Sequence, residues 1–209
     1  MLRYWTAGES HGKTLIALVD GFPAGMTVDV EPINVELKRR QGGYGRGGRQ
    51  RIESATVDVR TGVWHNVTLG SPIVLEVVNR DYKLERLEDL QRPRPGHGDL
   101  TGSMKYLGSI RGVLERASAR ETAVRVAAGA LAKQLLAEFG ISVFGYVVEL
   151  GGEKIEPVEA PLHRLREIRD ESAIYGLNLE RDEPIKKLID AAGKDGDTLG
   201  GIVEVRVDG

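Results

Sequence analysis

The sequence predicts an α/β fold, with helices packed against β-sheet in one continuous domain over residues 1–209. Three observations favour this class. Short apolar or alternating runs separated by Gly, Pro and Asn fill the first half, a long segment with helical spacing follows, and strand and helix patterns then alternate to the end. Because 41% of the residues are apolar, a chain of 209 residues can form a substantial core.

Four runs in the first half have the pattern of strands: 13–20, 25–30, 51–60 and 72–79. A short helix is expected over 32–41. Pro32 suits the first position of a helix, and the glycine pair that follows residue 41 would end it.

Residues 119–138 are predicted to form the principal helix. Ser118 and Glu121 have the spacing of a capping box, and Gly140 follows the last turn. Such a helix is expected to be sandwiched between other elements, because small side chains dominate one face and allow close packing. The residues that recur at helical spacing are Ala123, Ala127, Ala130, Leu131 and Leu135.

A strand over 142–150, helical segments near 160–170 and 181–192, and a strand over 201–207 complete the expected order. Because the chain stops directly after this last strand, we expect it to be truncated at the C-terminus.

Composition excludes several classes of protein. The absence of cysteine rules out disulfides and thiolate metal sites and favours a cytoplasmic location. No apolar run is long enough to span a bilayer, and the N-terminus lacks a secretory signal, so no membrane association is expected. The 29 Lys and Arg residues against 31 Asp and Glu residues give a net charge of -2, which argues against a dedicated nucleic-acid-binding protein.

The stretch GESHG at residues 8–12 matches G-x-S-x-G, the turn that presents the nucleophilic serine of α/β-hydrolases. Only seven residues precede Gly8, and the apolar run after the motif has the pattern of a strand where the hydrolase turn requires a helix. A nucleophilic Ser10 is therefore disfavoured, although a serine hydrolase stays an alternative. His11, placed between Gly8 and Gly12, is the stronger candidate for chemistry.

Arginine and glycine are concentrated in residues 39–51, RRQGGYGRGGRQR, with five of each. The arginine fork binds phosphate or carboxylate, and glycine lets the backbone approach an anion, so a polyanionic small molecule is the expected ligand. Two alternatives stay open: a solvated basic loop, and an RNA-binding segment of the RGG type at 46–49. The glycines do not fit a dinucleotide fingerprint, because a helix precedes them where a strand is required.

A second histidine, His97, lies between two glycines in RPRPGHGD at 92–99. The prolines restrict this loop, and Asp99 is placed to orient the imidazole. Two such histidines and an arginine-rich loop suit a charged phosphate ester, with donors for the anion and imidazoles that move protons. His65 and His163 have ordinary strand and helix contexts, and no spacing of His, Asp or Glu resembles a metal site.

Four stretches resemble, in the same order, the signature blocks of the chorismate synthase family: GESHG at 8–12, RRQGGYGRGGR at 39–49, RPRPGHGD at 92–99 and ERASARETAVRVAAGA at 115–130. The resemblance implies a β-α-β sandwich with helices between sheets, assembled as a homotetramer. It also implies a lyase of the shikimate pathway to aromatic amino acids. Such a lyase eliminates phosphate from 5-enolpyruvylshikimate 3-phosphate to give chorismate, requires reduced FMN and is linked to NADP.

The resemblance implies roles for individual residues as well. His11 would protonate the departing phosphate, and His97 would lie beside the flavin and manage its protonation. The remaining implied contacts are Ser10, Arg40 and Arg46 with the substrate, and Arg116, Ala117 and Ser118 with FMN where the long helix begins. Reduced flavin would come from a separate reductase, since no reductase-like segment is visible in the chain.

The chain departs from the family pattern at three points. Gly98 stands where the family usually has Ala, and the segment 106–111 is about one residue shorter than the family pattern leads us to expect. Family members also continue beyond a strand such as 201–207, and carry further flavin contacts and catalytic Arg and Asp residues there. The resemblance therefore implies an N-terminal portion of the enzyme, whose activity by itself is open.

Overall fold

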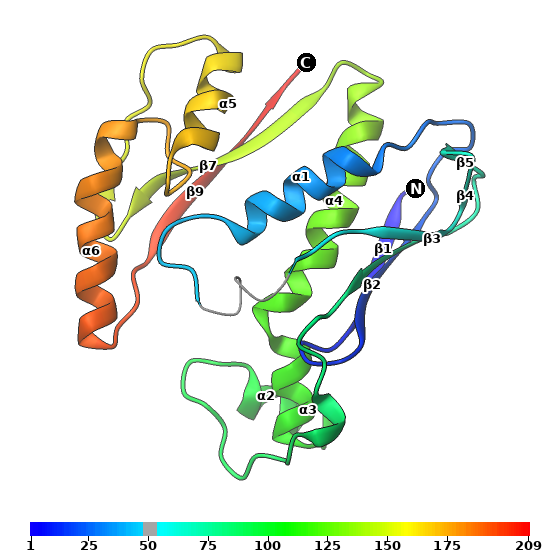
Figure 1. Ribbon diagram of the computed structural model, residues 1–209, viewed down its shortest axis with the longest axis horizontal. Coiled ribbons are helices and arrows are strands. Elements are labelled where there is room, and N and C mark those ends of the chain that lie inside the picture. The colour runs from blue at the N-terminus through cyan, green and yellow to red at the C-terminus, as the bar shows by residue number, and fades with distance from the viewer. Residues whose placement is uncertain (48–53) are drawn as a thin grey trace. The chain divides into compact units, whose positions relative to one another are not determined.

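A computed structural model describes residues 1–47 and 54–209 of the protein (Figure 1). The chain divides into two compact units, each with its own sheet and helices. Unit 1 comprises residues 1–38 and 51–134, and unit 2 comprises residues 39–50 and 135–209. The expectation of one continuous domain over 1–209 stays a prediction.

Unit 1 contains an antiparallel sheet of four strands in the order β1-β2-β6-β3. These strands are β1 (Arg3–Gly8), β2 (Thr14–Asp20), β6 (Ile73–Val78) and β3 (Asp58–Thr61). Side chains alternate along the two central strands, and their register places the buried residues of both on one face. The buried pairs are Leu15↔Val77, Ala17↔Leu75 and Val19↔Ile73. The strands predicted over 13–20 and 72–79 are confirmed.

Two long helices, α1 (Val30–Gln41) and α4 (Thr122–Ala137), accompany this sheet, and only the last three residues of each belong to unit 2. Figure 1 shows the two helices crossing, and the Lys133 ammonium lies 2.6 Å from the Glu36 carboxylate. The buried positions of α4 are mostly alanine: Ala123, Val124, Ala127, Ala128, Ala130 and Leu131. The predicted helices over 32–41 and 119–138 are confirmed, and so is the small-residue face of the second.

The first residues of α1 differ from the prediction. Asp29 Oδ1 accepts a hydrogen bond from Glu31 N at 2.9 Å, so the helix begins at Val30. Pro32 is consequently the third helical residue instead of the first. This position tolerates proline because the N–H groups of the first turn have no partner inside a helix.

Two predicted strands differ from the structure. The strand predicted over 25–30 is wrong, because this stretch holds a turn and one isolated bridge from Thr27 to Val67 before the helix begins. The strand predicted over 51–60 is shorter, since β3 covers only its end, and residues 51–53 lie outside the described part of the chain.

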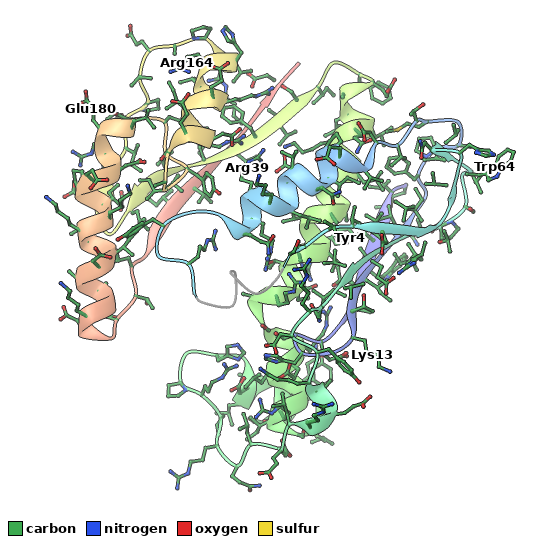
Figure 2. The ribbon with its side chains drawn as sticks, in the orientation of Figure 1. Tyr4, Lys13, Arg39, Trp64, Arg164 and Glu180 are labelled. Carbon is green, nitrogen blue, oxygen red and sulfur yellow. The ribbon has the colours of Figure 1, made fainter. Side chains whose placement is uncertain are left out.

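Several short elements of unit 1 carry no strong sequence pattern. These are β1, β4 (Val63–Trp64), β5 (Val67–Thr68), η2 (Leu84–Arg86), α2 (Asp99–Tyr106) and α3 (Ile110–Ala117). The first three residues of the predicted helix over 119–138 form a 3-10 turn, η3 (Ala119–Glu121), directly before α4. His65 lies in the turn between β4 and β5 with a φ of 47°, so the strand context expected for it is wrong. Figure 2 shows the neighbouring Trp64 extending away from this hairpin, and 67% of its surface is exposed.

Unit 2 contains an antiparallel sheet of three strands in the order β8-β7-β9. Its elements are β7 (Ser142–Leu150), β8 (Glu153–Lys154), α5 (Leu162–Glu171), η4 (Leu179–Arg181), α6 (Asp182–Asp195) and β9 (Gly201–Asp208). Two buried clusters form its core: Phe144, Tyr146, Leu165 and Leu177 in one, and Ile155, Ile174 and Ile185 in the other. The two strands and two helices predicted for this half are confirmed. In the ranges 1–47 and 54–209, no helix is long and apolar enough to cross a membrane.

Candidate active site

The GESHG loop connects two strands of the same sheet, β1 and β2. A strand does precede Gly8, contrary to the expectation, but a strand also follows the loop where a hydrolase turn requires a helix. Ser10 is 2% exposed, and its backbone N–H donates to the carbonyl of Glu115 at 2.9 Å. The geometry of the nucleophile turn is therefore absent from this loop, and the loop instead positions His11.

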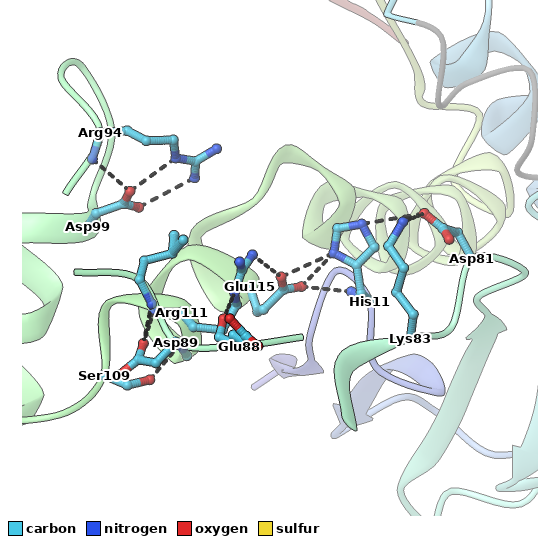
Figure 3. Close-up of polar contacts among 12 residues, drawn as sticks. His11, Asp81, Lys83, Glu88, Asp89, Arg94, Asp99, Ser109, Arg111 and Glu115 are labelled. Atoms are coloured by element: carbon cyan, nitrogen blue, oxygen red, sulfur yellow. Dashed lines mark hydrogen bonds and ion pairs between the residues drawn. The ribbon is translucent and has the colours of Figure 1, made fainter. Parts of the chain in front are cut away.

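A buried carboxylate holds His11 from one side (Figure 3). Glu115 of α3 is fully buried, and its Oε2 lies 2.9 Å from His11 Nδ1. The same oxygen accepts the backbone N–H of His11 at 2.8 Å. Arg111, one turn earlier on α3, approaches this carboxylate at 3.6 Å. Glu115 therefore fixes both the backbone and the ring of His11.

A second carboxylate faces the other ring nitrogen. His11 Nε2 lies 3.4 Å from Asp81 Oδ2, and Lys83 Nζ lies 3.0 Å from the same oxygen. The His11 side chain keeps 19% of its surface exposed. The imidazole is thus held between two carboxylates and still reachable by a ligand.

Asn79 closes the loop around His11. Its amide nitrogen donates to the carbonyls of Glu9 and Gly12, at 3.0 and 2.9 Å, and its amide oxygen accepts from Arg120 Nε at 2.9 Å. Sequence reasoning identified neither Asn79 nor Glu115 as a site residue. Asn79 could have been noticed only because it directly follows an apolar strand. Glu115 could have been noticed only because it begins the motif ERASARETAVRVAAGA, which resembles the family pattern.

His97 lies in the second cluster of unit 1. The fully buried Asp99 accepts from Arg94 N at 3.1 Å and Arg94 Nε at 3.0 Å, and it also bonds His97 Nδ1, as predicted. The Arg94 guanidinium, followed by its backbone N–H and by His97, lowers the pKa of Asp99 from 3.8 to about 2. Asp99 is therefore a carboxylate at neutral pH and orients the ring.

The departure at Gly98 is compatible with this geometry. A Cβ atom added at Gly98 would lie 3.4 Å from the Cβ of Ala117, which is an ordinary contact. The alanine usual in the family would therefore fit here without rearrangement.

Of the three residues expected where the long helix begins, only Ser118 lies there, as the N-cap of the 3-10 turn η3 that leads into α4. Arg116 and Ala117 end α3, and Ser118 is the residue between α3 and η3. The Ser118 hydroxyl accepts from the backbone N–H of Arg120 at 3.3 Å, so the capping box with Glu121 is wrong. The guanidinium of Arg116 donates to the backbone and hydroxyl oxygens of Thr6, at 2.9 and 2.8 Å.

A cavity of about 340 Å³ lies between α2 and α3. It is lined by Gly98, Thr101, Gly102, Lys105, Tyr106, Val113, Arg116 and Ala117. Two cations and an apolar wall suit a ligand with an anionic group and a flat apolar part. The structure therefore brings Arg116 and Ala117, two of the three predicted cofactor residues, together in one cavity, which is also lined by Gly98, the residue after His97. Ser118 does not line this cavity.

The predicted substrate arginines belong to unit 2. Arg40 lies in the last turn of α1, and Arg46 Nε donates to the carbonyl of Gly42 at 2.9 Å. Arg46 also lines a cavity of about 470 Å³ together with Tyr44 and Tyr175. Two further arginines of this loop, at positions 49 and 51, lie outside the described residues. Within the described ranges, no group of three or more His, Asp or Glu side chains is placed to hold a metal ion.

Known proteins match the chain over its whole length. A sequence profile of the family named Chorismate synthase matches residues 2–209. The chorismate synthase of Lactococcus lactis subsp. cremoris is 48% identical, and that of Enterococcus faecalis is 47% identical, over 224 residues each. The alignments cover 100% of this chain and 58% of each relative, so the chain spans a little more than half the length of the proteins it matches.

The fold matches as well. A solved structure titled Crystal Structure of Chorismate Synthase superposes with a TM-score of 0.79 at 39% sequence identity, over 99% of this chain and 57% of the other. The α/β fold class expected from the resemblance is therefore confirmed. By sequence and by fold, the chain belongs to the chorismate synthase family.

Proposed function

We propose that the chain carries the catalytic chemistry of chorismate synthase, the 1,4-anti elimination of phosphate from 5-enolpyruvylshikimate 3-phosphate to give chorismate. The observation that carries this proposal is His11, held between Glu115 and Asp81 in a family motif and still partly exposed. Because the chain spans 58% of the length of its relatives, the activity of the whole enzyme is itself part of the proposal.

His11 is the general acid of this proposal. The elimination expels a phosphate dianion, whose oxygen gains basicity as the carbon–oxygen bond breaks. Glu115 holds Nδ1 of His11 at 2.9 Å, and Nε2, which lies 3.4 Å from Asp81, is the nitrogen that transfers a proton to that oxygen. The departing oxygen takes both electrons of the carbon–oxygen bond and the proton of the imidazolium, so phosphate leaves as the hydrogen phosphate dianion. The C6 hydrogen is lost as a proton, and the electrons of its bond enter the new double bond.

The cavity between α2 and α3 is the proposed site of reduced FMN. Arg116 and Lys105 supply cations for the phosphate of the cofactor, and Val113, Tyr106 and Ala117 supply apolar surface for its ring. Bound reduced FMN would supply transient electron density that assists phosphate departure and removal of the C6 hydrogen.

His97 is the proposed proton carrier beside this cofactor. Its neighbour Gly98 lines the cavity, and Asp99 holds the Nδ1 side of its ring. Ser118 does not line the cavity, so contact of Ser118 with FMN rests on the motif alone.

Arg40 and Arg46 are the proposed ligands of the substrate anions. The planar guanidinium suits both the phosphate and the carboxylates of the substrate, and the 470 Å³ cavity beside Arg46 supports an anion site there. Ser10 is buried, which supports a role in holding the loop more than a direct substrate contact.

The proposal extends to the setting of the enzyme. It includes a homotetramer in the cytoplasm, a separate reductase that supplies reduced flavin, and a link to NADP, with neither nucleic acid nor membrane as a partner. These parts rest on the family resemblance and on composition.

The first experiment is anaerobic release of phosphate from 5-enolpyruvylshikimate 3-phosphate with chemically reduced FMN, and with oxidised FMN as the control. Release should require the reduced flavin. His11→Ala should lower kcat by roughly 10²–10⁴-fold, the usual contribution of a general acid, with KM little changed. His163→Ala, at an exposed position of α5, is the matched control and should leave both constants unchanged.

Two outcomes would contradict the proposal. Release at equal rates with oxidised and reduced FMN would remove the flavin requirement. No release with either flavin would show that this chain lacks the activity, although its membership of the family would stand.

A further inference from the structure

Glu115 is an ionisable side chain with no exposed surface. Burial of a carboxylate is unfavourable by several kcal/mol unless charged or hydrogen-bonding partners replace water. Its partners are the ring and the backbone N–H of His11, with Arg111 at 3.6 Å. The hydrogen bonds that compensate for burying the Glu115 carboxylate are therefore largely the ones that it makes with His11.

An ionised carboxylate can only accept hydrogen bonds. Glu115 Oε2 and Oε1 lie 2.9 and 3.1 Å from His11 Nδ1, so this nitrogen must carry a hydrogen for the contact to be favourable. We propose that Glu115 is a positioning residue that fixes the Nδ1–H tautomer of His11 and reserves Nε2 for proton exchange with the ligand.

One oxygen of Glu115 also links the ring to its own backbone. Oε2 accepts from the main-chain N–H of His11 and from the ring N–H, and the carbonyl of Glu115 accepts from the N–H of Ser10. Three contacts from a single residue of α3 thus restrain both the loop and the side-chain torsions of His11. Such restraint keeps Nε2 in one place and removes an entropic cost from proton transfer.

Asp81 is the competing acceptor, because its carboxylate would favour a hydrogen on Nε2, but its Oδ2 lies 3.4 Å from Nε2, whereas Glu115 Oε2 lies 2.9 Å from Nδ1. Asp81 is also paired with Lys83, while Arg111 pairs with Glu115 on the opposite side. The functional consequence rests on the proposed function. His11 would lose its Nε2 proton to the leaving phosphate oxygen and become the neutral Nδ1–H form that Glu115 stabilises.

The test reads the tautomer directly and requires no activity. Two-bond ¹H–¹⁵N correlation spectra of the full chain, at a pH where the rings are neutral, distinguish the two tautomers of each of its four histidines. The His11 signals are assigned by their loss in His11→Ala. Wild type should show the Nδ1–H tautomer.

Two variants of Glu115 distinguish the effect of its hydrogen-bond acceptor from the effect of its negative charge. Glu115→Met, of similar shape and without an acceptor oxygen, should convert His11 to the Nε2–H tautomer or a mixture. Glu115→Gln keeps an acceptor oxygen and should retain the Nδ1–H tautomer. Asp182→Asn is the matched control, because Asp182 is a buried carboxylate of unit 2 that accepts from Ser172 and Ala173. It should leave the His11 tautomer unchanged.

Kinetics supply a second readout. Glu115→Met should lower kcat roughly 10²-fold with little change in KM, and Glu115→Gln should recover part of that loss. An Nε2–H tautomer in wild type, or an unchanged tautomer in Glu115→Met, would overturn the proposal. If Glu115→Met does not fold, the tautomer of His11 in wild type by itself supports or overturns the proposal. If wild type releases no phosphate, the proposed function fails while the spectra still decide the role of Glu115.

Discussion

At the scale of single residues, Asp99 makes part of the stability depend on pH. Its pKa in the folded chain is about 2, against an ordinary value of 3.8. A carboxyl group with a lowered pKa adds stability that is fully present above the unfolded pKa and is lost as pH falls through the folded pKa. We therefore expect the contribution of Asp99 to the free energy of unfolding to disappear between about pH 4 and pH 2.

Denaturant unfolding of wild type and Asp99→Asn over this pH range checks the expectation. The difference in unfolding free energy between the two should be largest above pH 4 and should shrink toward pH 2. A difference that stays constant with pH would mean that Arg94 and His97 do not depress this pKa.

Asn79 should act through its two donors. In Asn79→Asp the amide N–H groups are lost, and the carbonyls of Glu9 and Gly12 face an oxygen instead. We expect the free energy of unfolding to fall by about 1–3 kcal/mol in urea denaturation. Asn34→Asp is the control: among residues 1–47 and 54–209 the Asn34 side chain bonds through its oxygen alone, accepting from Val57 N at 3.0 Å, so that variant should lose much less. Equal losses would contradict the donor argument.

The site residues that sequence could predict are those with a local signal. Glycines around His11 and His97 and the adjacent Asp99 were visible in short stretches. Glu115 is 104 positions from His11 in the chain, and no periodicity or spacing connects two such positions. Contacts of this kind come from the packing of α3 against a loop, which only the folded chain specifies.

At the scale of elements, the contact between α2 and α3 depends on Gly102. A Cβ atom at this position would lie 2.3 Å from Val113 Cγ1, and the β-branched valine has little freedom to move. Gly102→Ala should therefore lower the free energy of unfolding by about 1–3 kcal/mol through overpacking.

Gly129→Ala is the matched variant. Gly129 lies in α4 with nothing within 4 Å of an added Cβ, so alanine should raise the free energy of unfolding by about 0.5–1 kcal/mol. Thermal unfolding of the two variants should shift in opposite directions. A stabilised Gly102→Ala would show that the two helices can separate without loss.

Elements with a sustained pattern could be predicted, and short ones could not. The alternation in β2 and β6 and the alanine-rich face of α4 extend over enough residues to identify each element. The helices α2 and α3 have eight residues each and contain glycine, so their propensity is weak. The run at 25–30 has apolar alternation but pairs with the short strand β5 only through one bridge, from Thr27 to Val67, and Asp29 begins a helix directly after it.

At the scale of the whole molecule, the separate cores predict separate local stabilities. Ile185 is fully buried in a cluster made only of unit 2 residues, and Leu75 is fully buried in the sheet of unit 1. Only the last three residues of α1 and of α4 belong to unit 2, so opening unit 2 would disturb one turn of each helix. That disturbance is small compared with the loss of a core.

Ile185→Ala should therefore destabilise unit 2 selectively, by about 2–5 kcal/mol. Hydrogen exchange followed by mass spectrometry should show faster exchange in β7 and α5 and little change in β2 and β6. Leu75→Ala should give the reverse pattern. If either variant accelerates exchange in both units equally, the chain unfolds as one cooperative domain, as its sequence led us to expect.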